Sequence, residues 1–402
     1  MKLLDPDLRP GAASRPAQPV APTRGRRWTK LRIALVVVLV ALTPVMWSYG
    51  RVLTRKSSDG LGVRSVEWVR DHGGSPLVAW IENEWYQHHA PPKGGLPKVL
   101  PSVAPAVTTA PPPPADVPEP VRLLVDAPLP AEGVWQPTGR TQNGGPPLLY
   151  TTFMRPDSVH TSLVTGLAWM DTKRVRFELW SGSQEPGGSG WHLQAPIPVG
   201  VRPDLVAAFN SGFKLADSRG GYYAEGRTAR PLAAGKASMV FHADGSFDVG
   251  AWGTEVTMTP DVVGVRQNLQ LLVDNGELAP NLDKASPAIW GWTVQNKTLV
   301  WRSGVGVDAH GHVLYAAGNG LSVASLANVL KAAGAVRAME LDINSAWTHF
   351  FWYHDDPTAG TAGTAGTVGT VGNKLLIDMT KSPGLYFESS SRDFVAVFVR
   401  RS

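Results

Sequence analysis

The chain has 402 residues, no cysteine and a formal net charge of +5 at pH 7. Residues 1–56 carry 11 Lys and Arg against 2 Asp and Glu, so the other 346 residues, with 27 basic and 31 acidic side chains, have a net charge of −4. The folded part lacks the basic excess that nucleic-acid binding requires, and we expect no nucleic-acid partner. The absence of cysteine excludes disulfides, thiolate metal sites and cysteine nucleophiles.

A basic arm is followed by an apolar run from Ile33 to Trp47. This run is short for a spanning helix of about 17–25 residues and long for a signal-peptide core of about 7–15 residues. No small-x-small cleavage pattern follows it, and aromatic residues lie where an interfacial belt is expected. We interpret residues 33–50 as a transmembrane signal anchor, with a cleaved signal as the main alternative and a buried core helix as a further one. The heavier basic flank predicts that residues 1–32 are cytoplasmic and that the C-terminal domain is extracellular.

Residues 51–90 are predicted to form a juxtamembrane amphipathic helical segment. Leu77, Ile81 and Trp85 recur every four residues, which places them on one helical face. This helix is expected either on the outer membrane surface or docked on its own domain. Residues 91–120 contain 11 prolines and are predicted to form a semi-extended linker.

Residues 121–402 are predicted to form one strand-rich domain. Apolar runs separated by turn residues indicate strands at 121–129, 146–154, 163–171, 174–182, 237–252, 269–278, 298–318, 374–379 and 394–399. His310 and His312 fall in a predicted hairpin turn, which makes them turn residues rather than metal ligands. The Gly/Thr/Ala-rich residues 355–373 are expected to form a surface loop, either a lid or a neutral expansion.

One helix is expected over residues 322–334, with Ser322 as its N-terminal cap and Gly334 at its end. A strand over residues 338–344 should follow at once. The fold class expected from these elements is α+β: a strand-rich mixed sheet domain with few helices, preceded by one transmembrane helix.

Polar residues within or after apolar runs mark the candidate site. An apolar run ends in a tight turn at 210–214, a buried strand carries a charged side chain at 302, and the stretch 339–344 alternates apolar and polar residues. If 339–344 is one strand, Glu340, Asp342 and Asn344 share one face.

The chain resembles the phosphodiester glycosidase family, related to N-acetylglucosamine-1-phosphodiester alpha-N-acetylglucosaminidase and with bacterial members linked to exopolysaccharide. The resemblance covers roughly residues 200–400 and rests on five motifs in the family's order: FNSGFK, GGYYAEG, LLVDNGEL, RSGVGVDAHGHVLYAAG and ELDINS. The family pattern Leu-Asp-Gly-Gly-Gly-Ser-Ser is kept here only at Leu341 and Asp342. Ile343, Asn344 and Ser345 replace the three glycines of this pattern, which can adopt conformations that other residues avoid. We therefore expect the strand to continue through Asn344 and the pocket to be narrower and more aromatic.

The resemblance implies hydrolysis of a sugar-1-phosphodiester, and the residues fit that chemistry. A phosphate monoester is a stable leaving group, so one carboxylate, Asp342, is sufficient to activate water or stabilise an oxocarbenium ion. Arg302 is predicted to hold the phosphodiester. Glu340, about 7 Å from Asp342 along a strand, is predicted either as a second carboxylate or as an ion-pair partner of Arg302. The predicted substrate-binding residues are Asn210, Ser211, Gly212, Lys214, Ser303, Asn344, Trp347 and Tyr353.

We therefore predict a membrane-anchored, extracytoplasmic glycosidase that hydrolyses a sugar-1-phosphodiester in an envelope or exopolysaccharide glycan. The alternatives are a catalytically inactive glycan-binding or envelope-assembly protein of the same fold, and a structural scaffold. The sequence requires no cofactor. Asp342 and Asn344 offer oxygen ligands for a divalent cation, but two ligands are too few to predict a metal site. The sequence leaves the oligomeric state open.

Overall fold

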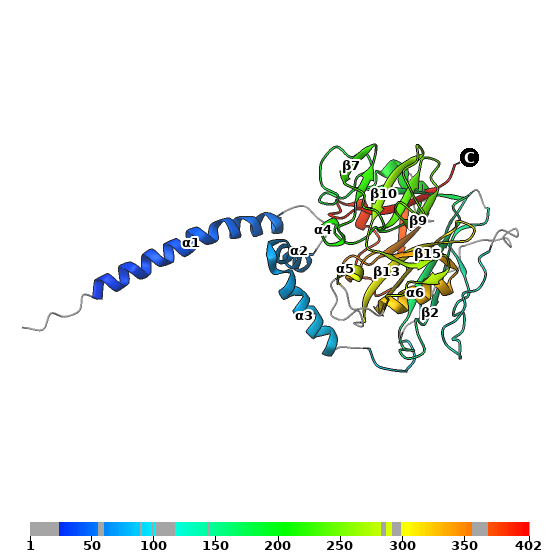
Figure 1. Cartoon of the computed structure of the whole chain (residues 1–402), viewed down its shortest axis with the longest axis horizontal. Coiled ribbons are helices and arrows are strands. Elements are labelled where there is room, and N and C mark those ends of the chain that lie inside the picture. Colours follow the sequence, from blue (N-terminus) through cyan, green and yellow to red (C-terminus); the bar gives the residue numbers. More distant parts are fainter. Residues whose placement is uncertain are drawn as a thin grey trace, which may run out of the picture. The chain divides into compact units, whose positions relative to one another are not determined.

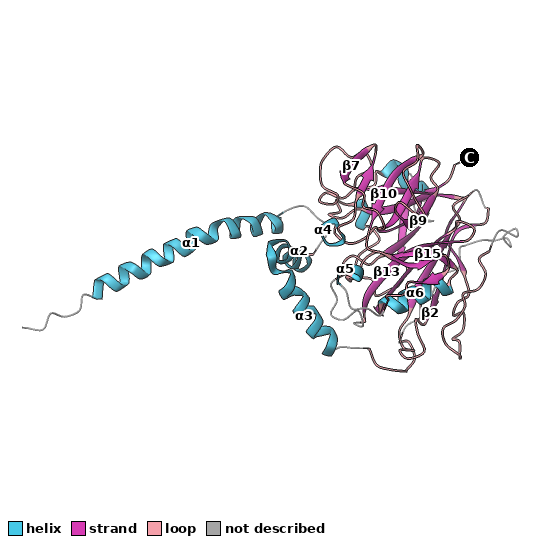
Figure 2. Cartoon of the chain, viewed as in Figure 1, coloured by secondary structure: helices cyan, strands magenta, loops and turns pink. Residues whose placement is uncertain are grey.

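The computed structural model describes residues 24–54, 60–88, 91–98, 100–101, 117–142, 145–282, 287–291, 299–355 and 369–401. The chain divides into two compact units, Met1–Arg55 and Lys56–Ser402. Strands dominate the second unit, in which helices are few (Figure 2). The predicted fold class, a strand-rich α+β domain with few helices, is confirmed. Most of the predicted linker and the Gly/Thr/Ala repeat lie outside the described residues.

The first unit contains α1, Arg24–Thr54, whose apolar side chains are exposed. Its stretch Lys30–Thr54 has 25 residues and contains an 18-residue window with a mean hydropathy of 2.1, so it is long and apolar enough to cross a membrane. A signal sequence near the N-terminus meets the same criteria. The signal anchor at 33–50 therefore stays a prediction.

The second unit begins with two helices joined by a π-helical turn, namely α2 Leu61–Val69, η1 Arg70–Gly74 and α3 Ser75–His88. The helical path breaks at His72 and Gly73, and Gly73 adopts a φ of +86° that few other residues tolerate. The helix predicted from the spacing of Leu77 and Ile81 is confirmed by α3.

The largest sheet has eight strands in the order β1-β2-β3-β14-β13-β15-β11-β12. Its strands are β1 Gln136–Thr141, β2 Pro147–Met154, β3 Thr165–Met170, β11 Leu271–Asp274, β12 Glu277–Leu278, β13 Val300–Asp308, β14 Val313–Leu321 and β15 Ala335–Glu340. The β13–β14 hairpin turns at His310 and Gly311, as predicted.

Two five-stranded sheets accompany it, with the orders β7-β6-β10-β8-β9 and β17-β16-β5-β18-β4. The strands of the first are β6 Tyr222–Ala224, β7 Arg227–Arg230, β8 Ala237–His242, β9 Phe247–Ala251 and β10 Val262–Gln267. Those of the second are β4 Val175–Trp180, β5 Leu205–Asn210, β16 Phe350–Asp355, β17 Thr370–Lys374 and β18 Phe394–Val399. The short helices are η2 Val199–Asp204, α4 Leu215–Ser218, α5 Pro287–Trp290 and η3 Leu385–Phe387. All ladders between these described strands are antiparallel.

The main hydrophobic core joins side chains of all three sheets, such as Val305 of β13, Phe241 of β8 and Val397 of β18. A second core covers the other face of the eight-stranded sheet, where α6, Val323–Ala332, buries Leu326 and Leu330. Figure 1 shows α6 lying along the strands of this sheet. Each strand of the sheet therefore has one face toward the sheet-to-sheet core and the other toward the α6 side.

The predicted helix at 322–334 is confirmed in detail. The Ser322 hydroxyl accepts the N–H of Ser325 at 3.0 Å, and the N–H of Ser322 donates to the Ser325 hydroxyl at 2.8 Å. This reciprocal cap satisfies donors that a helix start leaves free. Gly334 follows with a φ of +102°, which ends the helix.

Three predicted strand positions are wrong. Residues 121–129 form an irregular segment whose Arg122 N–H bonds to the end of α6 instead of to a strand. Residues 375–379 form a turn after β17, although Leu375 and Leu376 are buried in the core. The strand predicted at 338–344 is β15, which starts at Ala335 and ends at Glu340. An apolar run indicates burial, and burial does not require a strand.

Candidate functional site

The site is built around Asp342, which lies just after β15. Backbone bonds to β13 continue past the end of β15: Leu341 N–H donates to Ser303 O at 2.8 Å and Ser303 N–H donates to Asp342 O at 2.9 Å. The chain then turns, and the Asp342 Oδ1 accepts the N–H groups of Ile343 and Asn344 at 2.8 and 3.1 Å. A local side-chain bond of this kind stabilises a turn in place of a strand. The predicted strand through Asn344 is therefore wrong at its end, and Asp342 lies in a turn where it is 3% exposed.

Arg392 is the ion-pair partner of Asp342. Its Nη2 donates to Asp342 Oδ2 and to Gly212 O, each at 3.1 Å, from the loop that precedes β18. Its guanidinium carbon lies 4.8 Å from the centre of the Trp347 ring, and Lys381 Nζ lies 5.3 Å from the same ring. The site therefore combines one carboxylate, two cations and one indole ring.

The electrostatics of this pair are governed by burial. Burial raises the pKa of Asp342 to about 6, although Arg392 and the two backbone N–H groups act in the lowering direction. Burial alone would lower the pKa of Arg392, but Asp342 and Glu67 raise it. Asp342 thus changes its protonation state close to neutral pH, which suits a general base.

The predicted turn at Asn210 packs directly beneath the site. Asn210 Nδ2 donates to Ser303 Oγ at 3.0 Å, while its Oδ1 accepts the hydroxyl of Tyr315 at 3.0 Å. Ser303 Oγ in turn accepts the N–H of Asp342 at 3.3 Å. Asn210 and Ser303 are both buried and position the turn of Asp342 through these bonds.

Ser211 belongs to a second supporting network that the sequence interpretation missed. Its hydroxyl donates to Asp393 Oδ2 at 2.5 Å, and Arg266 Nε donates to the same oxygen at 2.6 Å. Asn268 Nδ2 donates to the carbonyl oxygens of Glu340 and Leu341 at 2.6 and 2.9 Å. The bonds to Asp393 hold the backbone next to Arg392 in place, and the bonds from Asn268 hold the end of β15.

Arg302 and Glu340 form a separate pair away from the sheet-to-sheet core. Arg302 Nη1 lies 2.5 Å from Glu340 Oε1, its Nε donates to Leu321 O at 2.8 Å, and both side chains are 0% exposed. Side chains alternate along β13, so Ser303 faces Asn210 while Arg302 faces the α6 side. The ion pair that was the alternative role for Glu340 is present. The structure does not bring the Arg302 side chain to Asp342 by any contact.

Of the two aromatic residues predicted to bind the sugar, Trp347 lies at the site and Tyr353 does not. Trp347 lies against Arg392, and its Nε1 has no hydrogen-bond partner among the described residues. Tyr353 is fully buried in β16, and its hydroxyl donates to Pro383 O at 2.9 Å, so no ring face is open for stacking on a sugar. Asn344 Oδ1 accepts the N–H of Ala346 at 2.8 Å and shapes the turn.

Lys214 connects the site to α2. Its Nζ lies 2.8 Å from Asp71 Oδ1 and forms an ion pair with Glu67. Burial alone would lower the pKa of Lys214, but both carboxylates raise it, and Lys214 with Arg392 holds the pKa of Glu67 below its usual range. Glu67 also acts on Asp342, whose pKa it raises. The segment Leu61–Gly74 therefore adds two carboxylates to the cations of the site.

The described residues also bear on whether the protein has the ligand set that a metal ion needs. No group of three or more His, Asp or Glu side chains that could hold a metal ion occurs among the residues that the structure describes.

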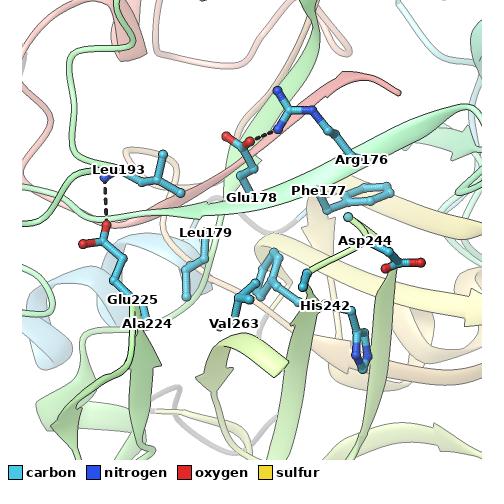
Figure 3. Close-up of a pocket in the computed structure, with 14 residues that line it drawn as sticks. Arg176, Phe177, Glu178, Leu179, Leu193, Ala224, Glu225, His242, Asp244 and Val263 are labelled. Atoms are coloured by element: carbon cyan, nitrogen blue, oxygen red, sulfur yellow. Dashed lines mark hydrogen bonds and ion pairs between the residues drawn. The ribbon is translucent and has the colours of Figure 1, made fainter. Parts of the chain in front are cut away.

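A separate pocket of about 300 Å³ lies between β4, β6, β10 and the β8–β9 turn (Figure 3). Its carboxylates already have partners within the protein: Glu178 pairs with Arg176, and Glu225 Oε1 accepts the N–H of Leu193 at 2.8 Å. None of the predicted site residues lines this pocket. This pocket is therefore separate from the candidate site at Asp342.

Comparison with known proteins gives one family. Residues 203–345 match the model of the phosphodiester glycosidase family. No curated protein matches the chain. Among solved structures, the chain is similar to the zebrafish N-acetylglucosamine-1-phosphodiester alpha-N-acetylglucosaminidase catalytic domain auto-inhibited by pro-peptide, with 15% identity over 67% of this chain and 88% of that one and a TM-score of 0.42.

Two further solved structures are more distant. A hypothetical protein from Synechocystis shares 13% identity over 59% of each chain, with a TM-score of 0.34. An exported protein from Burkholderia pseudomallei shares 10% identity over 60% of this chain and 74% of that one, with a TM-score of 0.29. The matched residues 203–345 include Asn210, Ser303 and Asp342.

Proposed function

We propose that this protein hydrolyses a sugar-1-phosphodiester bond, with Asp342 as the catalytic carboxylate and Arg392 as the phosphate-binding group. The observation that carries the proposal is the buried Asp342–Arg392 pair beside Trp347, with Oδ2 and Nη2 3.1 Å apart. A carboxylate with a pKa near 6 and an adjacent guanidinium are the two charges that this reaction needs.

The reaction needs only one proton acceptor. The oxygen of a water molecule attacks the anomeric carbon, and the bond between that carbon and the phosphate oxygen breaks. The electron pair of the broken bond leaves with the phosphate monoester, which is already a stable anion and needs little protonation. The proton of the water goes to Asp342. The acid of an ordinary glycosidase pair is therefore dispensable, and a second carboxylate at Glu340 is not required.

Arg392 takes the role that the sequence interpretation gave to Arg302. A guanidinium binds a phosphodiester through paired charge-assisted hydrogen bonds, and it is worth most where charge builds up on the leaving oxygen. Arg392 Nε has no hydrogen-bond partner among the described residues, so it is available as a donor. Lys214 and Lys381 supply further positive charge. Trp347 offers an indole N–H and a ring edge to the sugar.

We propose that the segment Leu61–Gly74, made of α2 and η1, competes with the substrate. Glu67 and Asp71 place their carboxylates on Lys214, one of the cations available to a phosphodiester. None of the side chains of α2 is fully buried, although some of them, including Trp68, are half-buried. Substrate binding is expected to displace Leu61–Gly74 from the site.

The location and substrate extend the proposal. We propose that residues 33–50 anchor the chain and that the basic flank holds the N-terminus in the cytoplasm, which places the domain outside the membrane. The natural substrate would then be an envelope or exopolysaccharide glycan with phosphodiester-linked sugars. A non-catalytic protein that binds the same glycans remains the alternative.

The test is sugar release by the full chain, purified in detergent, from a synthetic N-acetylglucosamine-1-phosphodiester and from phosphodiester-linked envelope polymers. Asp342→Asn and Arg392→Ala should each lower turnover by about 10² to 10⁴-fold, as expected on loss of a general base or a charge-stabilising group. Arg401→Ala is the matched control, because the Arg401 side chain is 77% exposed and pairs with Asp204 on the surface.

The outcomes separate the alternatives. Turnover that survives both substitutions would place the chemistry elsewhere. Binding of the polymers without sugar release, at any of the pH values tested, would support the glycan-binding alternative. Neither binding nor release would favour the scaffold.

A further inference from the structure

The helix α3 exposes an apolar patch that the catalytic proposal does not use. Leu77, Trp80 and Ile81 are 56%, 61% and 52% exposed. They are spaced by three and four residues, so they lie on one face of the helix. A neighbouring side chain, Val78, is buried. Part of α3 is thus packed against the protein, while its largest described apolar side chains are left in contact with solvent.

This patch, formed by Leu77, Trp80 and Ile81, has the features of an interaction site. Single exposed apolar residues need no explanation, but a cluster with an indole ring on one helical face is typical of an interaction site. Among the described residues, the protein itself supplies no cover for the three side chains. Polar contacts hold the preceding segment, through Glu67 and Asp71.

The position of the patch in the chain points to the occupant. The membrane-length apolar helix ends at Thr54, and only six residues separate it from Leu61. Six residues reach at most about 21 Å, and the helical path from Leu61 to Leu77 adds about 24 Å. The patch therefore stays within about 45 Å of the point where the chain would leave a bilayer. A surface helix with Leu, Ile and Trp on one face binds such an interface by burying that face about 5–10 Å into the lipid.

We propose that the Leu77–Trp80–Ile81 face of α3 docks on the outer surface of the bilayer that α1 crosses, so that the protein has a second, peripheral membrane contact. The apolar part covers the first two turns of α3, and the next turn on this face carries Glu84 and His88, which are exposed and paired at 3.5 Å. The N-terminal half of α3 enters the interface, and the exposed Glu84 and His88 remain in water.

The chain offers a direct test because it contains no cysteine. Single-cysteine variants of the full chain, Leu77→Cys, Trp80→Cys and Ile81→Cys, are labelled with an environment-sensitive fluorophore and reconstituted into phospholipid vesicles. The matched control is Val263→Cys, because Val263 is an apolar residue of β10, outside α3, with 44% exposure. Quenching is measured with nitroxide-bearing lipids and with iodide in solution.

Bilayer docking predicts about threefold stronger quenching by lipid nitroxide at 77, 80 and 81 than at 263, with iodide quenching weakened at the same three positions. Equal iodide access at 80 and 263, with no lipid quenching at either, would overturn the proposal. Protection from both quenchers, growing with the protein-to-lipid ratio, would mean that a second copy of the chain covers the patch. These readouts do not depend on turnover, so they stand whatever the activity of Asp342.

A second variant makes the contact quantitative. Leu77→Ser with Ile81→Ser removes the aliphatic part of the patch and leaves the label site at 80. Lipid quenching at 80 should fall to the level of the control at 263. Unchanged quenching at 80 would show that the fluorophore, and not the helix face, enters the bilayer.

Discussion

Two carboxylates only two residues apart, Glu340 and Asp342, each pair with an arginine, and the two pairs differ in their surroundings. Arg302 and Glu340 are 0% exposed on the α6 side of the large sheet. Arg392 and Asp342 retain side-chain exposures of 11% and 4% and contact Gly212 and Trp347. A sealed pair cannot exchange its partner for a ligand without breaking the core, whereas a pair at the core's edge can.

The comparison separates stability from chemistry. Glu340 lies in the last residue of β15, where strand alternation fixes its direction toward Arg302. Asp342 lies in a turn, where its own backbone N–H bonds fix it. We therefore expect substitutions in the first pair to change the free energy of unfolding and substitutions in the second pair to change turnover.

The largest effect is expected from Arg302→Ala. The substitution leaves the Glu340 carboxylate buried without its cation, which should lower the free energy of unfolding by about 3–5 kcal/mol. The measurement is urea unfolding of the full chain in detergent, followed by tryptophan fluorescence. The double substitution Arg302→Met with Glu340→Leu should recover most of the loss. If Arg302→Ala instead unfolds like the wild type but loses turnover, the phosphate-binding role first predicted for Arg302 is right.

The sequence predicted the elements whose signals are local. The Ser322 cap, the β13–β14 turn and the alternation up to Glu340 each depend on a few neighbouring residues, and the structure has all three. Asp342 was identified by its motif, but its partner was not. Arg392 lies 50 residues away in a loop, and its only local signal is an Arg-Asp pair before an apolar strand.

The wrong strand end after Glu340 also arose because a local pattern does not reveal side-chain partners. The alternating pattern from 339 to 344 predicted a strand through Asn344, because periodicity alone cannot detect that the Asp342 side chain bonds its own backbone. The sequence does not say which face of β13 carries α6, so it could not predict that Arg302 pairs with Glu340 on that side. Long-range partners, such as Asn268 on the end of β15, leave no periodic trace.

A smaller effect is expected from Asp342→Asn, which should raise the free energy of unfolding, whereas most substitutions of buried residues lower it. The folded pKa of Asp342, about 6, exceeds its unfolded value near 4. The folded state therefore binds more protons between these values, and the free energy of unfolding falls as pH rises through this window. The substitution removes that loss, so at pH 8 the variant should be more stable than the wild type by up to about 3 kcal/mol.

The check is unfolding of both proteins at pH 4 and pH 8. The gain should be present at pH 8 and absent at pH 4. A variant that is less stable than the wild type at pH 8 would mean that the Arg392 ion pair contributes more than burial costs, and Asp342 would then be a structural residue like Glu340.

Arg392→Lys should have a smaller effect, on turnover alone. Lysine keeps the positive charge but not the planar fork that binds two oxygen atoms at once, so kcat/KM should fall about tenfold, less than for Arg392→Ala. The free energy of unfolding should change by less than about 1 kcal/mol. Arg401→Lys serves as the control. Equal losses for the lysine and alanine variants would show that geometry, and not charge, carries the role of Arg392.

The smallest predicted effect tests the α2 segment. Glu67→Gln removes one of the two carboxylates on Lys214, so a phosphodiester meets less competition and turnover should rise about threefold at low salt, with a smaller rise at high salt. Glu84→Gln is the matched control, because Glu84 is an exposed glutamate of α3, outside Leu61–Gly74. Because Glu67 raises the pKa of Asp342, its removal should also move the acidic limb of the pH–rate profile to lower pH. A fall in turnover with the same pH shift would make Glu67 a member of the catalytic site, and α2 would then complete that site instead of covering it.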